Sequence, residues 1–192
     1  MIMKKIIEKS FLDSAGIIKK SLTLSTKIET AVEMICDCIR NGHVVYLFGN
    51  GGSAADAQHI AAELIGRYKM ERNSIPAISL STDTSILTSI SNDYSFSKIF
   101  SRQCDALVNE DDVIIAISTS GNSKNVINGV ITAKKKKAKI VGLLGNNGGK
   151  LKKIVDIPLT VESNSTARIQ EVHRVIYHII CELVEIELMK NR

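Results

Sequence analysis

Five short runs of consecutive apolar residues, separated by segments with helical spacing, constrain the fold of this 192-residue chain more than any other feature. The run from Val113 to Ile117 is an example. Continuous apolar runs are typical of strands that are buried on both faces, as in a parallel sheet. We expect strands at 44–48, 76–80, 112–118, 139–144 and 156–161, and helices at 53–70, 83–91, 95–108, 123–136 and 165–189. This alternation predicts an α/β fold with a doubly wound, five-stranded parallel sheet flanked by helices.

A long helical segment precedes the first predicted strand. Residues 4–41 carry apolar side chains at helical spacing, with a break near Leu24-Ser25-Thr26 and an end at Asn41-Gly42. The apolar stripe of residues 7–39 is either core or oligomer interface. Length and the absence of a linker or internal repeat favour a single domain over 1–192, in which residues 1–42 form N-terminal helices that make oligomer contacts.

Composition excludes several classes of protein. No apolar run reaches the roughly 18 residues that a membrane-spanning helix needs, and we see no cleavable signal pattern. Four scattered cysteines fit a reduced compartment, so we expect a cytoplasmic protein without a membrane partner. The net charge of +5 is concentrated in Lys134-Lys135-Lys136-Lys137, which is typical of a solvated last helical turn. With few aromatic residues for base stacking, we expect no nucleic-acid partner.

The loop after the first predicted strand has the composition of a phosphate site. Asn50, Gly51 and Gly52 tolerate the positive φ of a tight turn and let the backbone approach a ligand. We expect Ser53 to cap the following helix, with Asp56 completing a capping box. The unpaired N–H groups of a helix start favour an anion such as phosphate.

Two ionisable residues follow on the same predicted helix. His59 and Glu63 stand at i and i+4, about 40° apart around the helix axis, so they share one face. A histidine on an alanine-rich helix is commonly a buried core residue, but the glycine loop before it and Glu63 after it favour a site. Together these residues indicate chemistry on a phosphorylated small molecule.

Two further loops follow predicted strands, where ligands bind in such sheets. They are Ser81-Thr82-Asp83-Thr84-Ser85 and Ser118-Thr119-Ser120-Gly121-Asn122-Ser123. Their hydroxyls and amides suit phosphate oxygens, although Ser123 also fits the cap of the next helix. The dinucleotide-binding pattern and the P-loop are both absent, so we expect no nucleotide cofactor.

Several of these segments match one known family. Residues 49–64, 81–85, 92–107, 117–123 and 166–185 resemble the sugar isomerase (SIS) domain family. The joint presence of AQHIAAEL and ARIQEVHRVIYH resembles, more narrowly, the branch that isomerises heptose phosphates. The resemblance covers essentially the whole chain.

The resemblance implies a ketose–aldose isomerase that converts sedoheptulose 7-phosphate to D-glycero-D-manno-heptose 7-phosphate. That reaction is the first step of bacterial ADP- or GDP-heptose biosynthesis for the lipopolysaccharide core or related glycans. It also implies a homotetramer with active sites at subunit interfaces and one zinc per subunit. The implied zinc ligands are His59, Glu63, Gln170 and His178. The implied substrate contacts are Asn50, Gly51, Gly52, Ser53, Glu63, Asn92, Asp93, Ser118, Thr119, Ser120, Ser123 and Gln170.

The chemistry agrees with this assignment in part. Aldose–ketose isomerisation needs a base and an acid, for which Glu63 and His178 are the natural catalytic pair. A zinc-bound carboxylate is a weaker base, so we expect loose coordination by Glu63. Gln170 and His178 lie about 80° apart around their helix, and glutamine is an unusual zinc ligand, so this second pair rests on resemblance. Leu144 stands where the family often has threonine, which leaves the role of loop 144–149 open.

For three other residues, the sequence leaves two interpretations open or favours a structural position over a functional one. Arg67 either forms a surface ion pair with Glu63, four residues before it, or contacts substrate. His173 lies about 140° from His178, which favours a surface or interface position over a ligand. His43 precedes a strand and is read as a turn residue.

The rival function is a non-enzymatic protein of the same fold that binds the replication initiator DnaA. That branch carries other residues where Glu63 and His178 stand, and this chain has both. A sugar-phosphate-sensing regulatory domain is disfavoured because no DNA-binding module is attached. The sequence therefore favours the enzyme.

Overall fold

A five-stranded, all-parallel sheet forms the centre of the computed structural model, which describes residues 2–190. The strand order is β2-β1-β3-β4-β5, with Val45 of β1 in register with Ala77 of β2 and Val113 of β3. The strands are β1 (Val45–Phe48), β2 (Ala77–Ser79), β3 (Val113–Ser118), β4 (Lys139–Gly145) and β5 (Ile157–Val161). The predicted fold class and all five strands are confirmed, because continuous apolar runs need cover on both faces.

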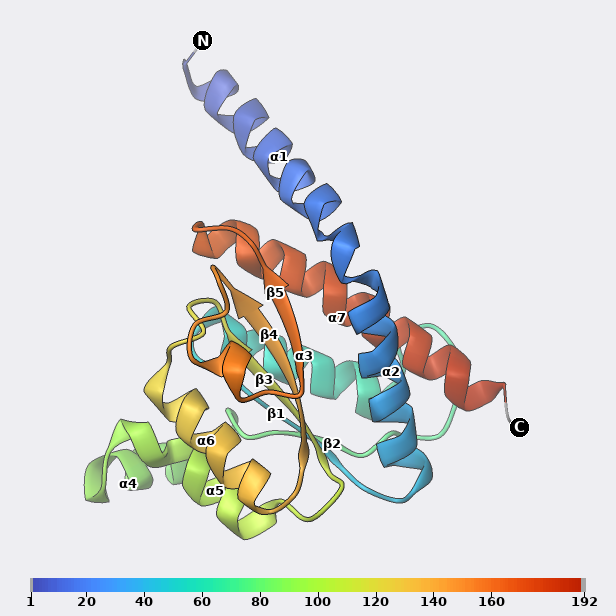
Figure 1. The fold of residues 1–192 in the computed structure, drawn as a ribbon, viewed down its shortest axis with the longest axis vertical. Helices are drawn as coiled ribbons and strands as arrows, with labels where there is room; N and C mark the ends of the chain where they lie inside the picture. The colour runs from blue at the N-terminus through green and yellow to red at the C-terminus, as the bar shows by residue number, and fades with distance from the viewer. Residues whose placement is uncertain (1, 191–192) are drawn as a thin grey trace.

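Helices cover the two faces of the sheet (Figure 1). The α-helices are α1 (Ile2–Lys20), α2 (Ser25–Arg40), α3 (Gly52–Ile65), α4 (Thr84–Asp93), α5 (Ile99–Leu107), α6 (Lys124–Lys135) and α7 (Thr166–Met189). Short 3-10 turns are η1 (Ser21–Leu24), η2 (Phe96–Lys98) and η3 (Leu151–Lys153). Helices α2, α3 and α7 bury one core against the sheet, and α5 and α6 bury a second core on the opposite face.

Two predicted helices differ from the observed ones. The helix expected at 53–70 ends at Ile65, because the Arg72 side chain takes up the carbonyl groups of its last turn. The helix expected at 95–108 is divided into η2 and α5. The expected break near Leu24 is confirmed as η1, which separates α1 from α2.

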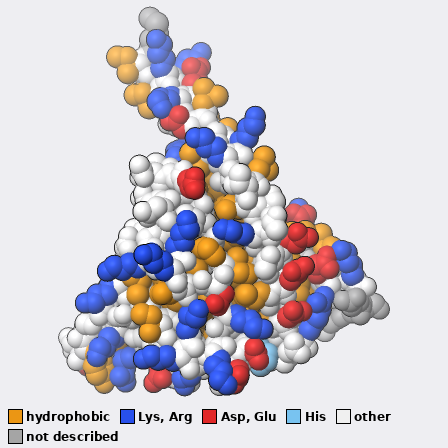
Figure 2. Space-filling model, in the orientation of Figure 1, with side chains coloured by type: hydrophobic (Ala, Val, Ile, Leu, Met, Phe, Trp, Pro, Cys, Tyr) orange, Lys and Arg blue, Asp and Glu red, His pale blue; other side chains and the backbone are white. Residues whose placement is uncertain are grey.

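Helix α1 extends away from the rest of the molecule (Figure 1). It buries no residue, and its apolar side chains, such as Ile6 and Phe11, are exposed. Figure 2 shows orange side chains along the projecting helix. Its contacts with α7 include Ser14 Oγ, which donates to Glu171 Oε2 at 2.6 Å. Within residues 2–190, no helix combines the length and the apolar character that crossing a membrane requires.

His173 lies in the core, so the expected surface or interface position is wrong. Its side chain is fully buried, and its Nε2 lies 3.0 Å from the carbonyl oxygen of Leu144 on β4. Burial lowers the pKa of His173 to about 4, although the hydrogen bond to Leu144 opposes this shift. Helical spacing relative to His178 could not reveal this, because α7 is covered by the sheet on one side and by α2 and α3 on others.

This burial predicts a loss of stability in mild acid. Between pH 6.5 and about 4 the unfolded chain binds a proton at residue 173 that the native state excludes, so the free energy of unfolding falls as pH falls through this window. Above pH 6.5 the effect is absent. Between pH 7 and pH 5 we expect about 2 kcal/mol from this residue. His173→Gln keeps an N–H donor but does not titrate. In urea unfolding, this variant should lose about 2 kcal/mol less than wild type between pH 7 and pH 5. An equal pH dependence in the two proteins would contradict the burial of a neutral His173.

Candidate active site

The loop between β1 and α3 is shaped by glycine. Gly51 has φ +55°, and a Cβ atom on Gly52 would collide with the side-chain amide of Gln170. Helix α3 begins at Gly52, so the expected cap at Ser53 is wrong: Ser53 is buried inside the first turn, and no side chain caps the helix. Ser53 N and Ala54 N donate to the loop carbonyls of Asn50 and Gly51, each at 3.0 Å, and the positive end of the helix dipole at this uncapped start suits an anion.

The polar loops at the carboxyl ends of β1, β2 and β3 meet, as the sequence predicts. Gly49 N donates to Ser81 Oγ at 3.4 Å. Asn50 and the buried Asn125 exchange two side-chain hydrogen bonds of 2.9 and 2.8 Å. This pair spans β1 and β3, whose helices α3 and α6 leave toward opposite faces of the sheet, the place where doubly wound folds bind ligands.

The serine-rich loop after β3 presents several hydroxyls close together. Ser118 Oγ lies 3.1 Å from Ser123 Oγ and 3.5 Å from Ser120 Oγ. Ser123 occupies the N-cap position of α6 but makes no side-chain cap hydrogen bond. The hydroxyls are therefore grouped at a helix start, as a phosphate site requires.

Loop 144–149, to which the resemblance assigned no role, packs against the backbone of the serine-rich loop and supports it. Asn146 Nδ2 donates to Thr119 O at 3.0 Å, and Leu151 N donates to Gly121 O at 3.0 Å. Gly121 has φ +65° and packs on the carbonyl of Gly148, where a Cβ atom would not fit. This loop therefore fixes the backbone of the hydroxyl-bearing residues.

Helices α3 and α7 bring together three residues that can ligate a metal. His59, Glu63 and His178 each offer a ligand atom, and these atoms all lie within 4.8 Å of one another. Two imidazoles and one carboxylate form a donor set typical of catalytic zinc. Gln170 lies two turns earlier on α7, with its amide against Gly52 at the start of α3. Three of the four predicted ligands are thus close together, and Gln170 lies beside the phosphate-type loop.

A hydrogen-bonded chain behind His59 orients its ring. Tyr177 Oη lies 3.0 Å from His59 Nδ1 and donates to Asp56 Oδ1 at 3.5 Å. His59 Nδ1–H can then donate to the phenol oxygen, so that Nε2 presents a lone pair to Glu63 Oε1 at 2.9 Å. Two facing acceptors need a proton or a metal cation between them. The arrangement therefore fits a metal ion held by His59 and Glu63.

The roles of Tyr177 and Asp56 are not apparent from the spacing of residues in the sequence. Asp56 was expected in a capping box, but it is buried and faces Tyr177 and Arg174, with 3.5 Å between Arg174 Nε and Asp56 Oδ1. Burial raises the pKa of Asp56, although the charge of Arg174 opposes this shift. Burial also raises the pKa of Tyr177, to about 12. Burial and the neighbouring His59 lower the pKa of His178. Tyr177 is thus protonated at neutral pH.

Other predicted residues lie elsewhere. Asn92 and Asp93 end α4, which packs on η2 and α5 rather than on α7, and they bond to each other at 2.9 Å. Arg67 lies beyond the end of α3, with its Nε 3.7 Å from Glu71 Oε2, so of its two interpretations the ion pair with Glu63 is wrong, and the contact with substrate stays a prediction. His43 lies in the turn before β1, as expected, with its Nδ1 3.8 Å from Asp112 Oδ1.

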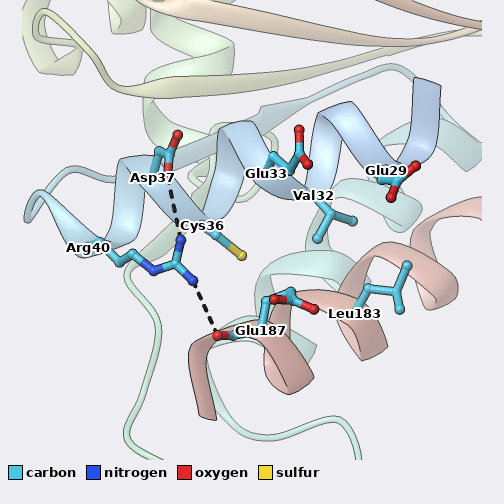
Figure 3. Close-up of a pocket in the computed structure, with 8 residues that line it drawn as sticks. All are labelled: Glu29, Val32, Glu33, Cys36, Asp37, Arg40, Leu183 and Glu187. Atoms are coloured by element: carbon cyan, nitrogen blue, oxygen red, sulfur yellow. Dashed lines mark hydrogen bonds and ion pairs between the residues drawn. The ribbon is translucent and has the colours of Figure 1, made fainter. Parts of the chain in front are cut away.

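A separate groove of about 440 Å³ between α2 and α7 contains none of the predicted site residues (Figure 3). Acidic side chains and Arg40 surround its apolar floor, and Arg40 Nη2 donates to Glu187 O at 3.2 Å. Burial raises the pKa of Cys36 to about 11, so this thiol is protonated at neutral pH.

Known proteins match this chain over most of its length. Residues 10–145 match the model of the SIS domain. A phosphoheptose isomerase of Geotalea daltonii is 53% identical over 169 residues, 88% of each chain. Among solved structures, a phosphoheptose isomerase from Francisella tularensis superposes with a TM-score of 0.92 at 36% identity, covering 96% of this chain and 98% of that one. The phosphoheptose isomerase of Neisseria gonorrhoeae gives 0.91 at 38% identity, with 95% and 98% covered.

The chain behind His59 predicts the effect of Tyr177→Phe. Loss of the hydroxyl removes the acceptor that orients His59, so we expect zinc affinity to fall about 10- to 100-fold. Competition with a chelating dye measures this affinity. Tyr46→Phe is the matched control, because Tyr46 is also buried and donates to Leu107 O at 3.0 Å in the opposite core. Equal affinities in the two variants would contradict the role of Tyr177.

Proposed function

The chain belongs to the SIS domain family, and on that premise we propose that it interconverts sedoheptulose 7-phosphate and D-glycero-D-manno-heptose 7-phosphate. Its relatives support a sugar-phosphate isomerase of the ketose–aldose class. We further propose that this reaction is the first step of bacterial ADP- or GDP-heptose biosynthesis and that it takes place in the cytoplasm.

The observation that carries the proposal is that Glu63 on α3 and His178 on α7 lie next to each other, with their ligand atoms within 4.8 Å of one another. Glu63 takes the proton from the carbon next to the carbonyl, and the electrons of that C–H bond form the double bond of an enediol. His178 gives a proton from a ring nitrogen to the carbonyl oxygen. Glu63 then returns its proton to the neighbouring carbon, while the second hydroxyl of the enediol gives its proton to His178. The carbonyl forms at the other carbon, and both residues regain their starting states.

The substrate phosphate is assigned to the loops at the carboxyl edge of the sheet. Two features support this placement, because both favour an anion. They are the start of α3 and the hydroxyls of the loop after β3, which belong to Ser118, Thr119, Ser120 and Ser123. Gln170, against Gly52, lies between this phosphate end and the Glu63–His178 pair along α7. A sugar phosphate would thus span the site lengthwise.

Zinc is the proposed metal, with His59, Glu63, His178 and Gln170 as its ligands. When bound, it would polarise the substrate carbonyl as a Lewis acid. The facing acceptors His59 Nε2 and Glu63 Oε1 support this assignment. Because Glu63 also acts as the base, its coordination must be exchangeable.

A homotetramer with active sites at subunit interfaces is the proposed assembly. The exposed apolar side chains of α1 support an interface within residues 1–42. Asn92 and Asp93 end α4, which packs on η2 and α5 rather than on α3 or α7, so a neighbouring subunit is the route by which they would reach a site.

The test incubates zinc-loaded and metal-free protein with sedoheptulose 7-phosphate and follows aldose formation. We expect turnover with zinc, and a fall in kcat of about 10²- to 10⁴-fold in Glu63→Gln with the metal still bound. Glu110→Gln is the control, because Glu110 is exposed and pairs with Lys137. Full turnover by Glu63→Gln would refute the base assignment, and no turnover in either metal state would favour the DnaA-binding alternative.

A further inference from the structure

The segment that follows α3, residues 66–72, lies against α7, although the sequence predicts that the helix continues to residue 70. The carboxylate of Glu185 on α7 accepts three consecutive backbone N–H groups, from Tyr68 at 2.7 Å, Lys69 at 2.8 Å and Met70 at 2.9 Å. The Lys69 side chain adds a 2.8 Å ion pair with Glu182. The segment is therefore fixed to the helix that carries His178.

A buried ion pair completes this attachment. Arg72 Nε lies 3.0 Å from Glu185 Oε1, with the two side chains only 3% and 1% exposed. The same guanidinium donates to the carbonyl oxygens of Glu63 and Leu64, each at 2.8 Å. Burial alone would raise the pKa of Glu185, but the three N–H groups and Arg72 outweigh it and lower the pKa, so the pair is ionised. One ion pair thus joins the end of α3, the segment and α7.

The segment places an aromatic ring on His178. The Tyr68 ring stacks on the imidazole with centroids 5.7 Å apart and planes 28° from parallel. Within residues 2–190, His178 makes no side-chain hydrogen bond, whereas His59 is held by Tyr177 and Glu63. Before a metal binds, ring contacts orient His178, and the other two, with Tyr177 and His59, are edge-on.

We propose that Tyr68, held by the Arg72–Glu185 ion pair, is a positioning residue that fixes the orientation of the His178 ring toward Glu63. The proposal rests on the isomerase function above. A catalytic side chain has to stay within about 10–20° of its productive orientation. Before the metal is bound, an imidazole without a hydrogen bond depends on packing for this, and Tyr68 supplies the one face-to-face contact among the described residues.

The test compares Tyr68→Leu with Tyr68→Phe. Leucine fills space but cannot stack, so we expect kcat to fall about 10- to 100-fold with KM changed less than about threefold. Phenylalanine keeps the stacked face and should retain kcat within about twofold. Met70→Ala, in the same segment, keeps its backbone N–H and serves as the matched control.

A second readout is independent of turnover. The chain has four histidines, so the carbon-bound ring protons of metal-free protein can be resolved and assigned by NMR. The His178 signals should lose their ring-current shift in Tyr68→Leu and keep it in Tyr68→Phe. Arg72→Lys keeps the charge but not the planar donor set, so it should shift the same signals in the same direction.

The outcomes separate the proposals. An inactive wild-type enzyme would refute the isomerase function, while the NMR comparison would still test the stacking of Tyr68 on His178. An active wild type with normal kcat and unshifted His178 signals in Tyr68→Leu would overturn the positioning role alone. Equal loss of kcat in Tyr68→Phe would assign the effect to the hydroxyl and also overturn it. Unshifted His178 signals in Arg72→Lys would overturn the part played by the ion pair.

Discussion

The close packing of α3 on α7 is the constraint on which the candidate site depends. Both helices start at the carboxyl edge of the parallel sheet, since α3 follows β1 and α7 follows β5. Contacts therefore repeat in step along the two helices: Gly52 meets Gln170, and His59 meets Tyr177 and His178. The missing side chain at Gly52 allows the approach at the first turn.

Buried charge is concentrated along this helix pair. Asp56 lies near its start and the Arg72–Glu185 ion pair near its end, with the metal-type cluster between them. Burying such groups costs free energy unless their partners are complete, so they specify one arrangement of the helices more than they add stability. The same groups orient His59 through Tyr177 and hold the segment that carries Tyr68.

The phosphate-type loops depend on a different constraint, the close approach of backbone segments. Asn50 and Asn125 link the loops across β1 and β3, and the glycines of loop 144–149 let it pack directly under Gly121. Hydroxyl-bearing residues alone would not make a rigid cradle. Their backbone is fixed by a loop from the next strand, whose part the resemblance had left open.

The sequence by itself determined the sheet, its parallel direction, the loops at its carboxyl edge and the His59–Glu63 face, because these follow from hydrophobic period and from spacing within one helix. It matched His178 to the site by resemblance alone. Only the tertiary structure decided the partners of Asp56, the burial of His173, and the placement of Tyr68 on His178. Each of these contacts joins elements far apart in the chain, so no local periodicity encodes it, and the packing of α7 against α3 and the sheet settles it.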